Sequence, residues 1–358
     1  MEQSGVQIMR EELVETLREA GKPTEVFQSS DGSTALILPY GARILGLFSP
    51  GSQENFYWTH PALDSPETAR AFYAGEQWHN SGGDRTWLAP EIDFFFPDFP
   101  SLDRYWQQRE LDPGHYQVVR KDGGLELVNE FSATVSRTKQ QVAMRLSKAL
   151  NPAPNPLRYE PGFKEIQDIE YAGYTLHTRL ELIGKSKDDA VRVGLWNLLQ
   201  MPHGGELWVP TYQRAEARVI MGSVSPEDLV VTDHLLRYKM RAAGEHKIGI
   251  RGVATTGRVG YVYETGGHSA LIVRNFFVNP SGEYVDVPWD ELSNQGFSTQ
   301  ACNIHSQLGS FSELEYHVPA IGSGTGLHRC HDVSQVWAYR GSQKQIQRVT
   351  SSLLAPEA

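Results

Sequence analysis

The chain contains 358 residues with a formal net charge of -10 and a sequence pI near 5.7, and 40% of its residues are hydrophobic. This composition is typical of a globular protein with a large core, and the acidic balance argues against a nucleic-acid partner, because proteins that bind phosphate backbones usually carry a basic excess. No apolar run approaches the roughly 20 residues that a helix needs to span a bilayer, so we expect no membrane partner.

The first predicted element is a helix over residues 9–20, where Leu13 and Leu17 fall on one stripe of a 3.6-residue period. Gly21 and Pro23 follow at positions where a helix usually ends. The polar N-terminal segment lacks the apolar stretch and small residues of a secretory signal. We therefore expect a helical segment that precedes the main domain.

After this helix the pattern changes to short apolar runs separated by turn residues. The predicted strands lie at residues 34–38, 43–48, 116–120, 141–150, 174–183, 191–200, 218–221, 247–251, 259–264, 270–278, 299–308 and 311–318. Many short strands with few helices predict an all-β sandwich or barrel. Strands of the same character continue on both sides of the proline-rich stretch 151–161, which predicts a loop rather than a linker. We thus assign residues 1–24 to the helical segment and residues 25–358 to one β-sandwich domain, which ends in a helix over residues 342–354.

Residues 78–91, with the sequence WHNSGGDRTWLAPE, combine charged groups, tryptophans and two adjacent glycines. Glycines allow a ligand to approach the backbone closely, arginine and carboxylates make directional hydrogen bonds, and tryptophan offers a flat apolar face. We interpret the segment as a loop that binds a polar ring such as a sugar. The alternative is a tight turn with a structural ion pair and core tryptophans. The candidate site residues in this segment are His79, Asp84, Arg85, Trp87 and Glu91.

A second polar region, residues 302–319, has the period-two pattern of a β-hairpin. Glu313, Glu315 and His317 alternate with apolar residues, and a turn centred near Ser310 would place His305 opposite Glu315. Such a face brings carboxylates and imidazoles within the width of one substrate, as proton transfer requires. The alternative is the solvated outer face of an antiparallel sheet.

The two cysteines of the chain, Cys302 and Cys330, allow at most one disulfide, which fits a reducing, cytoplasmic setting. Together with His305, His328 and His331 they supply the ligand types of a zinc site. Their spacing is irregular, so we predict no metal site.

Four short segments occur in an order that resembles a known family. Residues 39–45 (PYGARIL) resemble the early strand and turn of the aldose 1-epimerase, or galactose mutarotase-like, superfamily. Residues 82–83 fall where that superfamily has a glycine pair that lines the sugar site, and residues 194–200 (GLWNLLQ) fall where it has a strand that ends in a catalytic histidine. Residues 314–319 (LEYHVP) resemble the late segment that carries the catalytic glutamate. The resemblance extends from about residue 25 to the end and is to an uncharacterised bacterial branch of the superfamily.

The resemblance implies an all-β, galactose mutarotase-like supersandwich of large antiparallel sheets, with short helices at both ends and a concave face that holds a sugar. It implies Glu315 as the general base, with no metal or redox cofactor. Trp196, however, stands where the family has its acid histidine, and an indole N–H does not ionise usefully. We therefore name His79 and His203 as candidate acids, followed by His305.

These observations lead to three hypotheses. The first is an aldose 1-epimerase-like isomerase that interconverts sugar anomers, with Glu315 as base and His79 or His203 as acid. The second is a non-catalytic carbohydrate-binding or sensing protein, and the third is a polysaccharide lyase or glycoside hydrolase. In each case we expect a small carbohydrate as partner of a monomer or homodimer. The predicted sugar-binding residues are Asp84, Arg85, Trp87, Glu91, Trp196, His305 and His317.

Overall fold

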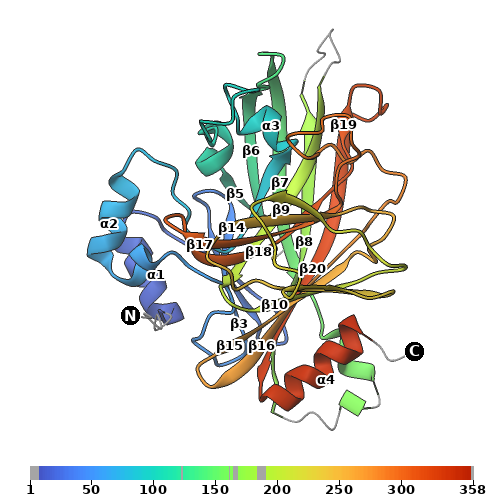
Figure 1. Ribbon diagram of the computed structural model, residues 1–358. Coiled ribbons are helices and arrows are strands. Elements are labelled where there is room, and N and C mark those ends of the chain that lie inside the picture. Colours follow the sequence, from blue (N-terminus) through green and yellow to red (C-terminus); the bar gives the residue numbers. More distant parts are fainter. Residues whose placement is uncertain (1–7, 122–123, 161, 164–167, 184–190, 356–358) are drawn as a thin grey trace.

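The computed structural model describes residues 8–121, 124–160, 162–163, 168–183 and 191–355, which fold into two large antiparallel sheets (Figure 1). The predicted all-β architecture with short helices near both ends is confirmed. Residues 1–7 of the predicted N-terminal segment and residue 161 of the predicted loop lie outside the described residues.

The first sheet has ten strands within the described part of the chain. In spatial order these are β1 (Glu25–Gln28), β2 (Thr34–Leu38), β3 (Arg43–Phe48), β4 (Asp84–Ala89), β9 (Arg192–Pro202), β18 (Gly309–His317), β17 (Thr299–Ser306), β14 (Gly244–Ile250) and β11 (Arg218–Met221), with β19 (Ile321–Gly322) paired to one end of β9.

The second sheet also has ten strands among the residues described. Their spatial order is β12 (Leu229–Val231), β13 (Leu235–Lys239), β10 (Glu206–Pro210), β15 (Arg258–Thr265), β16 (His268–Phe276), β20 (Arg329–Gly341), β8 (Glu170–Leu182), β7 (Gln141–Pro152), β6 (Gly124–Thr134) and β5 (Gln117–Lys121).

The main core lies between the two sheets. Leu199 and Leu314 of the first sheet belong to the same buried cluster as Leu176 and Ile272 of the second sheet. Because side chains alternate along a strand, the residues next to Leu199 and Leu314 point to the opposite face of the first sheet. We call the face toward the second sheet the inner face and the opposite face the site face.

Two of the helices cover the ends of the molecule. Helix α1 (Arg10–Glu19) matches the predicted N-terminal helix and packs with α2 (Pro66–Ala74) in one apolar cluster (Figure 1). Helix α4 (Gln343–Leu354) matches the predicted C-terminal helix, starts with a capping box at Ser342, and packs on β16 and β20. No helix in the described ranges is long and apolar enough to cross a membrane. The described part of the chain also contains four short helical segments: η1 (Pro61–Asp64), α3 (Glu91–Phe94), η2 (Glu110–Gly114) and η3 (Pro156–Tyr159).

Strand β4 corrects the interpretation of residues 78–91 as a loop, because six of these residues form a buried strand between β3 and β9. Gly82 and Gly83 precede this strand with φ angles of 102° and 73°. A Cβ atom at either glycine would lie 2.3 Å from a carbonyl oxygen, that of Trp58 or of Ile44. The glycine pair therefore permits close backbone packing where β4 enters the sheet, and not the approach of a ligand.

Candidate active site

A cluster of side chains, all buried except that of Tyr105, lies on the site face of the first sheet. Opposed residues of antiparallel neighbours point to the same face, and the register places Arg85, Glu315 and Gln300 in one row across β4, β9, β18 and β17. We call this group the site-face cluster. It consists of Arg85 and Trp87 on β4, Trp196 and Gln200 on β9, Lys247 on β14, Gln300 and Cys302 on β17, and Glu313, Glu315 and His317 on β18, with Glu91, Tyr105 and Asp286 from segments outside these strands.

Strands β17 and β18 form the predicted hairpin, but the predicted register is wrong. Ser306 pairs with Gly309, which leaves residues 307–308 as the turn and pairs His305 with Ser310. The prediction paired His305 with Glu315, five positions from its actual partner Ser310, and an odd shift exchanges the two faces of one strand relative to the other. His305 consequently points to the opposite side of the sheet from Glu315.

The shared face of Glu313, Glu315 and His317 is confirmed by this register. All three residues are buried, with at most 6% of their surface exposed. The alternative of a solvated outer sheet face is therefore wrong. Burying this many ionisable groups costs free energy unless they are paired. The partners of these groups are therefore part of the site.

Glu315 is held by two donors on one of its oxygens. The indole N–H of Trp196 donates to Glu315 Oε2 at 2.8 Å, and Lys247 Nζ lies 3.3 Å from the same oxygen. The Lys247 ammonium also lies 4.4 Å from the centre of the Trp196 ring, within the range of a cation–π contact. Both donors fix the carboxylate while its other oxygen, Oε1, has no hydrogen-bond partner among the described residues.

Lys247 links Glu315 to a second carboxylate, that of Glu91. Lys247 Nζ lies 3.4 Å from Glu91 Oε2, and the hydroxyl of Tyr105 donates to Glu91 Oε1 at 2.9 Å. Glu91 is the first residue of α3, directly after β4 and Pro90. The segment after β4 thus turns its first carboxylate onto the site face, where Lys247 bridges it to Glu315.

Asp286 and His317 form the next part of the cluster. Asp286 Oδ1 accepts the backbone N–H of Glu91 at 2.7 Å, and its Oδ2 accepts the side-chain amide of Gln300 at 2.7 Å. His317 stacks on Trp196 at a ring separation of 5.6 Å, with Nε2 3.7 Å from Asp286 Oδ2. These contacts tie the segment between β16 and β17 to the start of α3.

Arg85 and Glu313 form an ion pair at the other side of Glu315. Arg85 Nη1 lies 2.8 Å from Glu313 Oε1, and that oxygen also accepts the side-chain amide of Gln200 at 2.9 Å. The Arg85 guanidinium lies 4.2 Å from the centre of the Trp87 ring. This part of the cluster offers charged hydrogen-bond donors beside a flat aromatic surface.

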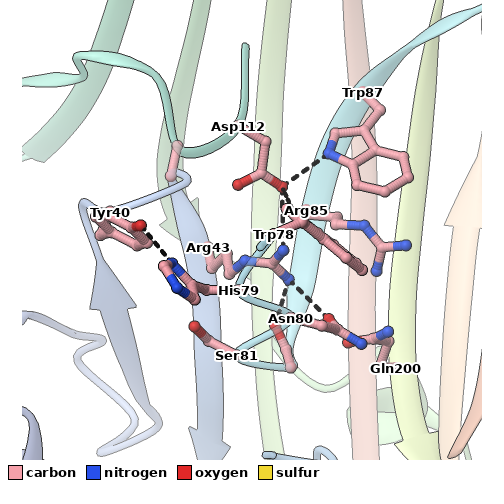
Figure 2. Close-up of polar contacts among 12 residues, drawn as sticks. Tyr40, Arg43, Trp78, His79, Asn80, Ser81, Arg85, Trp87, Asp112 and Gln200 are labelled. Carbon is pink, nitrogen blue, oxygen red and sulfur yellow. Dashed lines mark hydrogen bonds and ion pairs between the residues drawn. The ribbon is translucent and has the colours of Figure 1, made fainter. Parts of the chain in front are cut away.

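Asp112 fixes the far end of the segment that begins at Glu91. Figure 2 shows three donors that converge on it, and all three reach Oδ2: Trp87 Nε1 at 2.9 Å, Trp78 Nε1 at 3.0 Å and Arg43 Nη2 at 3.1 Å. Arg43 is fully buried and also donates to the carbonyl oxygen of Gly82 at 2.9 Å. The segment is therefore attached to the site face by a carboxylate at each end, Glu91 and Asp112.

Burial raises the pKa of Glu315 to about 7; the ammonium of Lys247 opposes this shift, and the neighbouring carboxylates of Glu313 and Glu91 reinforce it. A carboxyl group with this pKa exchanges its proton near neutral pH, which suits a general base. Burial also raises the pKa of Glu91, again opposed by Lys247 and reinforced by Asp286.

The two basic groups next to these carboxylates differ in charge. Burial lowers the pKa of His317 to about 4, so its imidazole is neutral at neutral pH. Burial alone would lower the pKa of Lys247 as well, but Glu315 and Glu91 outweigh that effect and raise it. Lys247 is thus a permanent cation, and His317 is a neutral hydrogen-bonding group.

Several buried polar atoms of the cluster have no hydrogen-bond partner in the part of the chain that the structure describes. These are Glu315 Oε1, Gln200 Oε1, Gln300 Oε1, Arg85 Nε and both ring nitrogens of His317. Buried polar atoms are nearly always satisfied by protein, water or ligand. Acceptors and donors left open on one sheet face are what a polyhydroxylated ligand or ordered water would satisfy.

The three histidines proposed as the acid lie elsewhere. His79 sits among Tyr40, Phe72 and Tyr73, with Nδ1 2.7 Å from the Tyr40 hydroxyl (Figure 2). His203 and His305 stack on each other at 4.7 Å, and His203 Nε2 lies 3.0 Å from Asn303 Oδ1 on the inner-face side. None of these histidines is among the described groups that contact Glu315.

Asp84 is also separated from the cluster, which corrects the expectation that it acts with its neighbour Arg85. Adjacent strand residues point to opposite faces, and Asp84 lies fully buried between the sheets, 2.7 Å from Arg274 Nη1 and from the Tyr174 hydroxyl. Asp84 and Arg85 therefore belong to two different ion pairs.

Cys302, Glu313 and Glu315 form the one group of possible metal ligands found in the described ranges, with ligand atoms within 4.8 Å of one another. Lys247 already places a positive charge on Glu315, so a metal ion would have to compete with this ammonium. The zinc arrangement considered from the sequence does not occur, because Cys302 and His305 lie on opposite faces of β17 and Cys330 lies in the other sheet.

A cavity of about 550 Å³ opens next to the cluster but does not contain it. Its lining includes Pro90 and Val285, the neighbours of Glu91 and Asp286, and the ion pair of Asp93 with Arg137. No member of the site-face cluster lines it. The hydrogen-bonding groups that chemistry requires are on the site face, so we assign the candidate site there.

Five members of the cluster were not predicted from the sequence: Tyr105, Gln200, Lys247, Gln300 and Asp286. The sequence held one signal for Lys247, because this charged residue is the first residue of the predicted strand 247–251, next to apolar positions. Asp286 and Tyr105 lie in segments without a periodic pattern, and only the tertiary structure brings them to the sheet.

Three solved structures are similar in overall shape. A galactose mutarotase related enzyme from Lactobacillus acidophilus aligns with 89% of this chain and 97% of its own, at 10% identity and a TM-score of 0.48. A galactose 1-epimerase from the same species aligns with 89% of this chain and 94% of its own, at 6% identity and a TM-score of 0.43. An alpha-galactosidase from Lactobacillus brevis aligns with 93% of this chain and 42% of its own, at 12% identity and a TM-score of 0.33.

A comparison with curated proteins finds no similar sequence. Residues 12–357, nearly the whole chain, match the family described as "Family of unknown function (DUF6786)", and the protein belongs to that family.

Proposed function

We propose that this protein is an aldose 1-epimerase-like isomerase, with Glu315 as the general base that removes the proton of the anomeric hydroxyl. The observation that carries the proposal is the state of Glu315: one oxygen is fixed by Trp196 and Lys247, the other has no partner in the described chain, and its pKa lies near 7. The resemblance of residues 314–319 to the glutamate segment of the superfamily supports the same role.

The groups around Glu315 suit a sugar. Arg85, Gln200 and Gln300 offer open donors and acceptors to hydroxyl groups, and the neutral His317 can donate or accept. Trp87 and Trp196 supply aromatic surface beside these polar atoms. The proposed ligand is a neutral monosaccharide or derivative, and the proposed reaction uses protein side chains without a cofactor.

The proposal includes a cytoplasmic location. Cys302 and Cys330 are unpaired thiols in two different sheets, and unpaired cysteines are typical of reducing compartments.

The experiment that tests the proposal is exchange NMR on a panel of aldoses and their derivatives, with the wild type and Glu315→Gln. The matched control is Asp332→Asn, because Asp332 is a buried carboxyl in the second sheet that accepts a hydrogen bond from Tyr316 and is outside the cluster. We expect enzyme-dependent anomer exchange for at least one sugar, lost in Glu315→Gln and kept in Asp332→Asn. No exchange with any sugar would contradict the proposal.

A second candidate function, sugar binding without turnover, is favoured by one observation. Trp196 occupies the position where the resemblance expects the acid histidine, and its N–H is committed to Glu315. Sugar-dependent increases in melting temperature without anomer exchange in the same panel would establish this function instead.

A further inference from the structure

Glu91 and Glu315 face each other across one ammonium group. Glu91 Oε2 lies 3.4 Å and Glu315 Oε2 lies 3.3 Å from Lys247 Nζ. The two carboxylate oxygens can therefore be no further apart than the sum of these two contacts. That spacing places both carboxyl groups within reach of a single sugar ring, since pairs of catalytic carboxyls in sugar chemistry stand roughly 5 to 9 Å apart.

Glu91 is positioned as firmly as Glu315. The Tyr105 hydroxyl donates to its Oε1 at 2.9 Å, and its backbone N–H donates to Asp286 at 2.7 Å. Its side chain is buried, with 7% of its surface exposed. A residue that only covered the site would not need three fixed contacts from three different segments.

The excess of carboxyl groups over cations in the cluster favours at least one protonated carboxyl group. Four buried carboxyl groups, Glu91, Asp286, Glu313 and Glu315, stand against two permanent cations, Arg85 and Lys247. Like charges that are close and buried do not all ionise. The remaining titratable or polar groups that face the pair are Tyr105 from the segment after α3, Trp196 on β9, Cys302 and Gln300 on β17, and His317 on β18.

We infer that Glu91 is the second proton-transfer residue of the site and takes the role that no histidine fills, with Lys247 as the positioning residue that holds Glu91 and Glu315 to one substrate. The inference rests on the proposed function. In ring opening, Glu315 accepts the proton of the anomeric hydroxyl, the bond between the anomeric carbon and the ring oxygen breaks, and the ring oxygen takes the proton of Glu91. After rotation of the carbonyl the same two protons return in reverse, so the enzyme is regenerated.

Lys247 itself is a poor proton donor in this scheme, because the carboxylates raise its pKa. Its ammonium instead contacts both carboxyl groups and keeps them oriented. The pair then titrates as a unit, and its two macroscopic steps belong to the pair and not to either residue.

The test is Glu91→Gln, which keeps the shape and the Tyr105 contact but cannot transfer a proton. The matched control is Asp93→Asn, a buried carboxyl in the same helix that pairs with Arg137 outside the cluster. We expect Glu91→Gln to slow anomer exchange about 10²–10⁴-fold, to keep the sugar-dependent increase in melting temperature, and to lose the alkaline limb of the pH profile. Asp93→Asn should keep both the rate and the profile.

Two outcomes separate this inference from the proposed function. If Glu315→Gln abolishes exchange and Glu91→Gln does not, Glu91 has no part in proton transfer and the proposed function stands. If the wild type exchanges no sugar, the proposed function fails, and with it the catalytic role of Glu91.

Infrared spectroscopy tests the shared proton without turnover. The wild type at neutral pH should show the carbonyl band of a protonated buried carboxyl group, which both Glu91→Gln and Glu315→Gln alter and Asp93→Asn does not. Absence of that band in the wild type would overturn the inference directly.

Discussion

Trp196 donates its indole N–H to Glu315 Oε2 at 2.8 Å, on the strand next to that of the carboxylate. A tryptophan thus occupies the place where the resemblance expects an acid histidine, and its indole contacts the proposed base. The hydrogen bond lowers the pKa of Glu315 against the effect of burial. The site therefore keeps its carboxylate usable near neutral pH with a group that cannot itself take part in proton transfer.

Trp196→Phe removes this donor and keeps an aromatic ring. A hydrogen bond to a charged group contributes about 1.5–3 kcal/mol, so the pKa of Glu315 should rise by roughly one unit or more. Since the base acts only when ionised, the acid limb of the anomer-exchange profile should move to higher pH. Trp208→Phe is the control, because its N–H donates to Glu206 in the second sheet. An unshifted acid limb in Trp196→Phe would contradict the role given to the indole.

Glu315→Gln should stabilise the folded protein in a pH-dependent way. The folded-state pKa of about 7 lies above the ordinary value of 4.5, so between these two pH values the folded state holds a proton that the unfolded state releases. The free energy of unfolding of the wild type therefore falls as the pH rises from the lower value to the higher one. Glu315→Gln cannot ionise at this position, so its free energy of unfolding does not fall in this way. Its free energy of unfolding should exceed that of the wild type by on the order of 1–3 kcal/mol at pH 8, and by less at pH 5.

Urea unfolding at the two pH values measures this difference, with Asp93→Asn, a buried carboxyl that pairs with Arg137 outside the cluster, as the control. An equal effect of Glu315→Gln at pH 5 and pH 8 would show that Glu315 has no raised pKa in the folded protein.

Tyr105→Phe tests the contact at the edge of the site. The Tyr105 side chain is partly exposed, and its hydroxyl lowers the pKa of the buried Glu91 through a 2.9 Å hydrogen bond. Without it the pKa of Glu91 should rise, and the alkaline limb of the exchange profile should move to higher pH. Tyr212→Phe, at an exposed tyrosine in another part of the chain, is the matched control. An unchanged alkaline limb in Tyr105→Phe would show that Tyr105 does not influence the pKa of the proposed acid, Glu91.

Asp112→Asn should be strongly destabilising. It neutralises the partner of Arg43, which is fully buried, and weakens two indole hydrogen bonds to the same oxygen (Figure 2). Breaking a buried ion pair typically costs about 3–5 kcal/mol. Thermal unfolding should show this loss, whereas Asp103→Asn, an exposed carboxylate on the same segment, should change the midpoint little. Equal midpoints for the two variants would contradict the anchoring role of Asp112.

Much of the fold could be predicted from the sequence, because both terminal helices and most strands of the first sheet carry strong periodic patterns. Strand β20 was missed although it has thirteen residues, since polar residues such as His331, Asp332 and Gln335 obscure its alternation. Strand β4 was read as a loop because charges and glycines usually mark loops. Its side chains are charged because they pair on both faces of a central strand, and only the neighbouring strands reveal that.

The candidate site could be predicted in part. The period-two pattern placed Glu313, Glu315 and His317 on one face, and that prediction is confirmed. The register of the hairpin was not determined by its sequence, because a turn centred near Ser310 would also pair the two strands. The bridge from Lys247 to Glu91 spans 156 positions of the chain, and no local pattern encodes a contact of that range.

The most direct test of the account is the rate of anomer exchange, measured by exchange NMR with the best sugar of the panel, for the wild type, Glu315→Gln and Asp332→Asn. We predict exchange well above the spontaneous rate for the wild type and Asp332→Asn, and a rate at the spontaneous level for Glu315→Gln. Catalysed exchange of equal rate in the wild type and Glu315→Gln would contradict the assignment of Glu315 as the base.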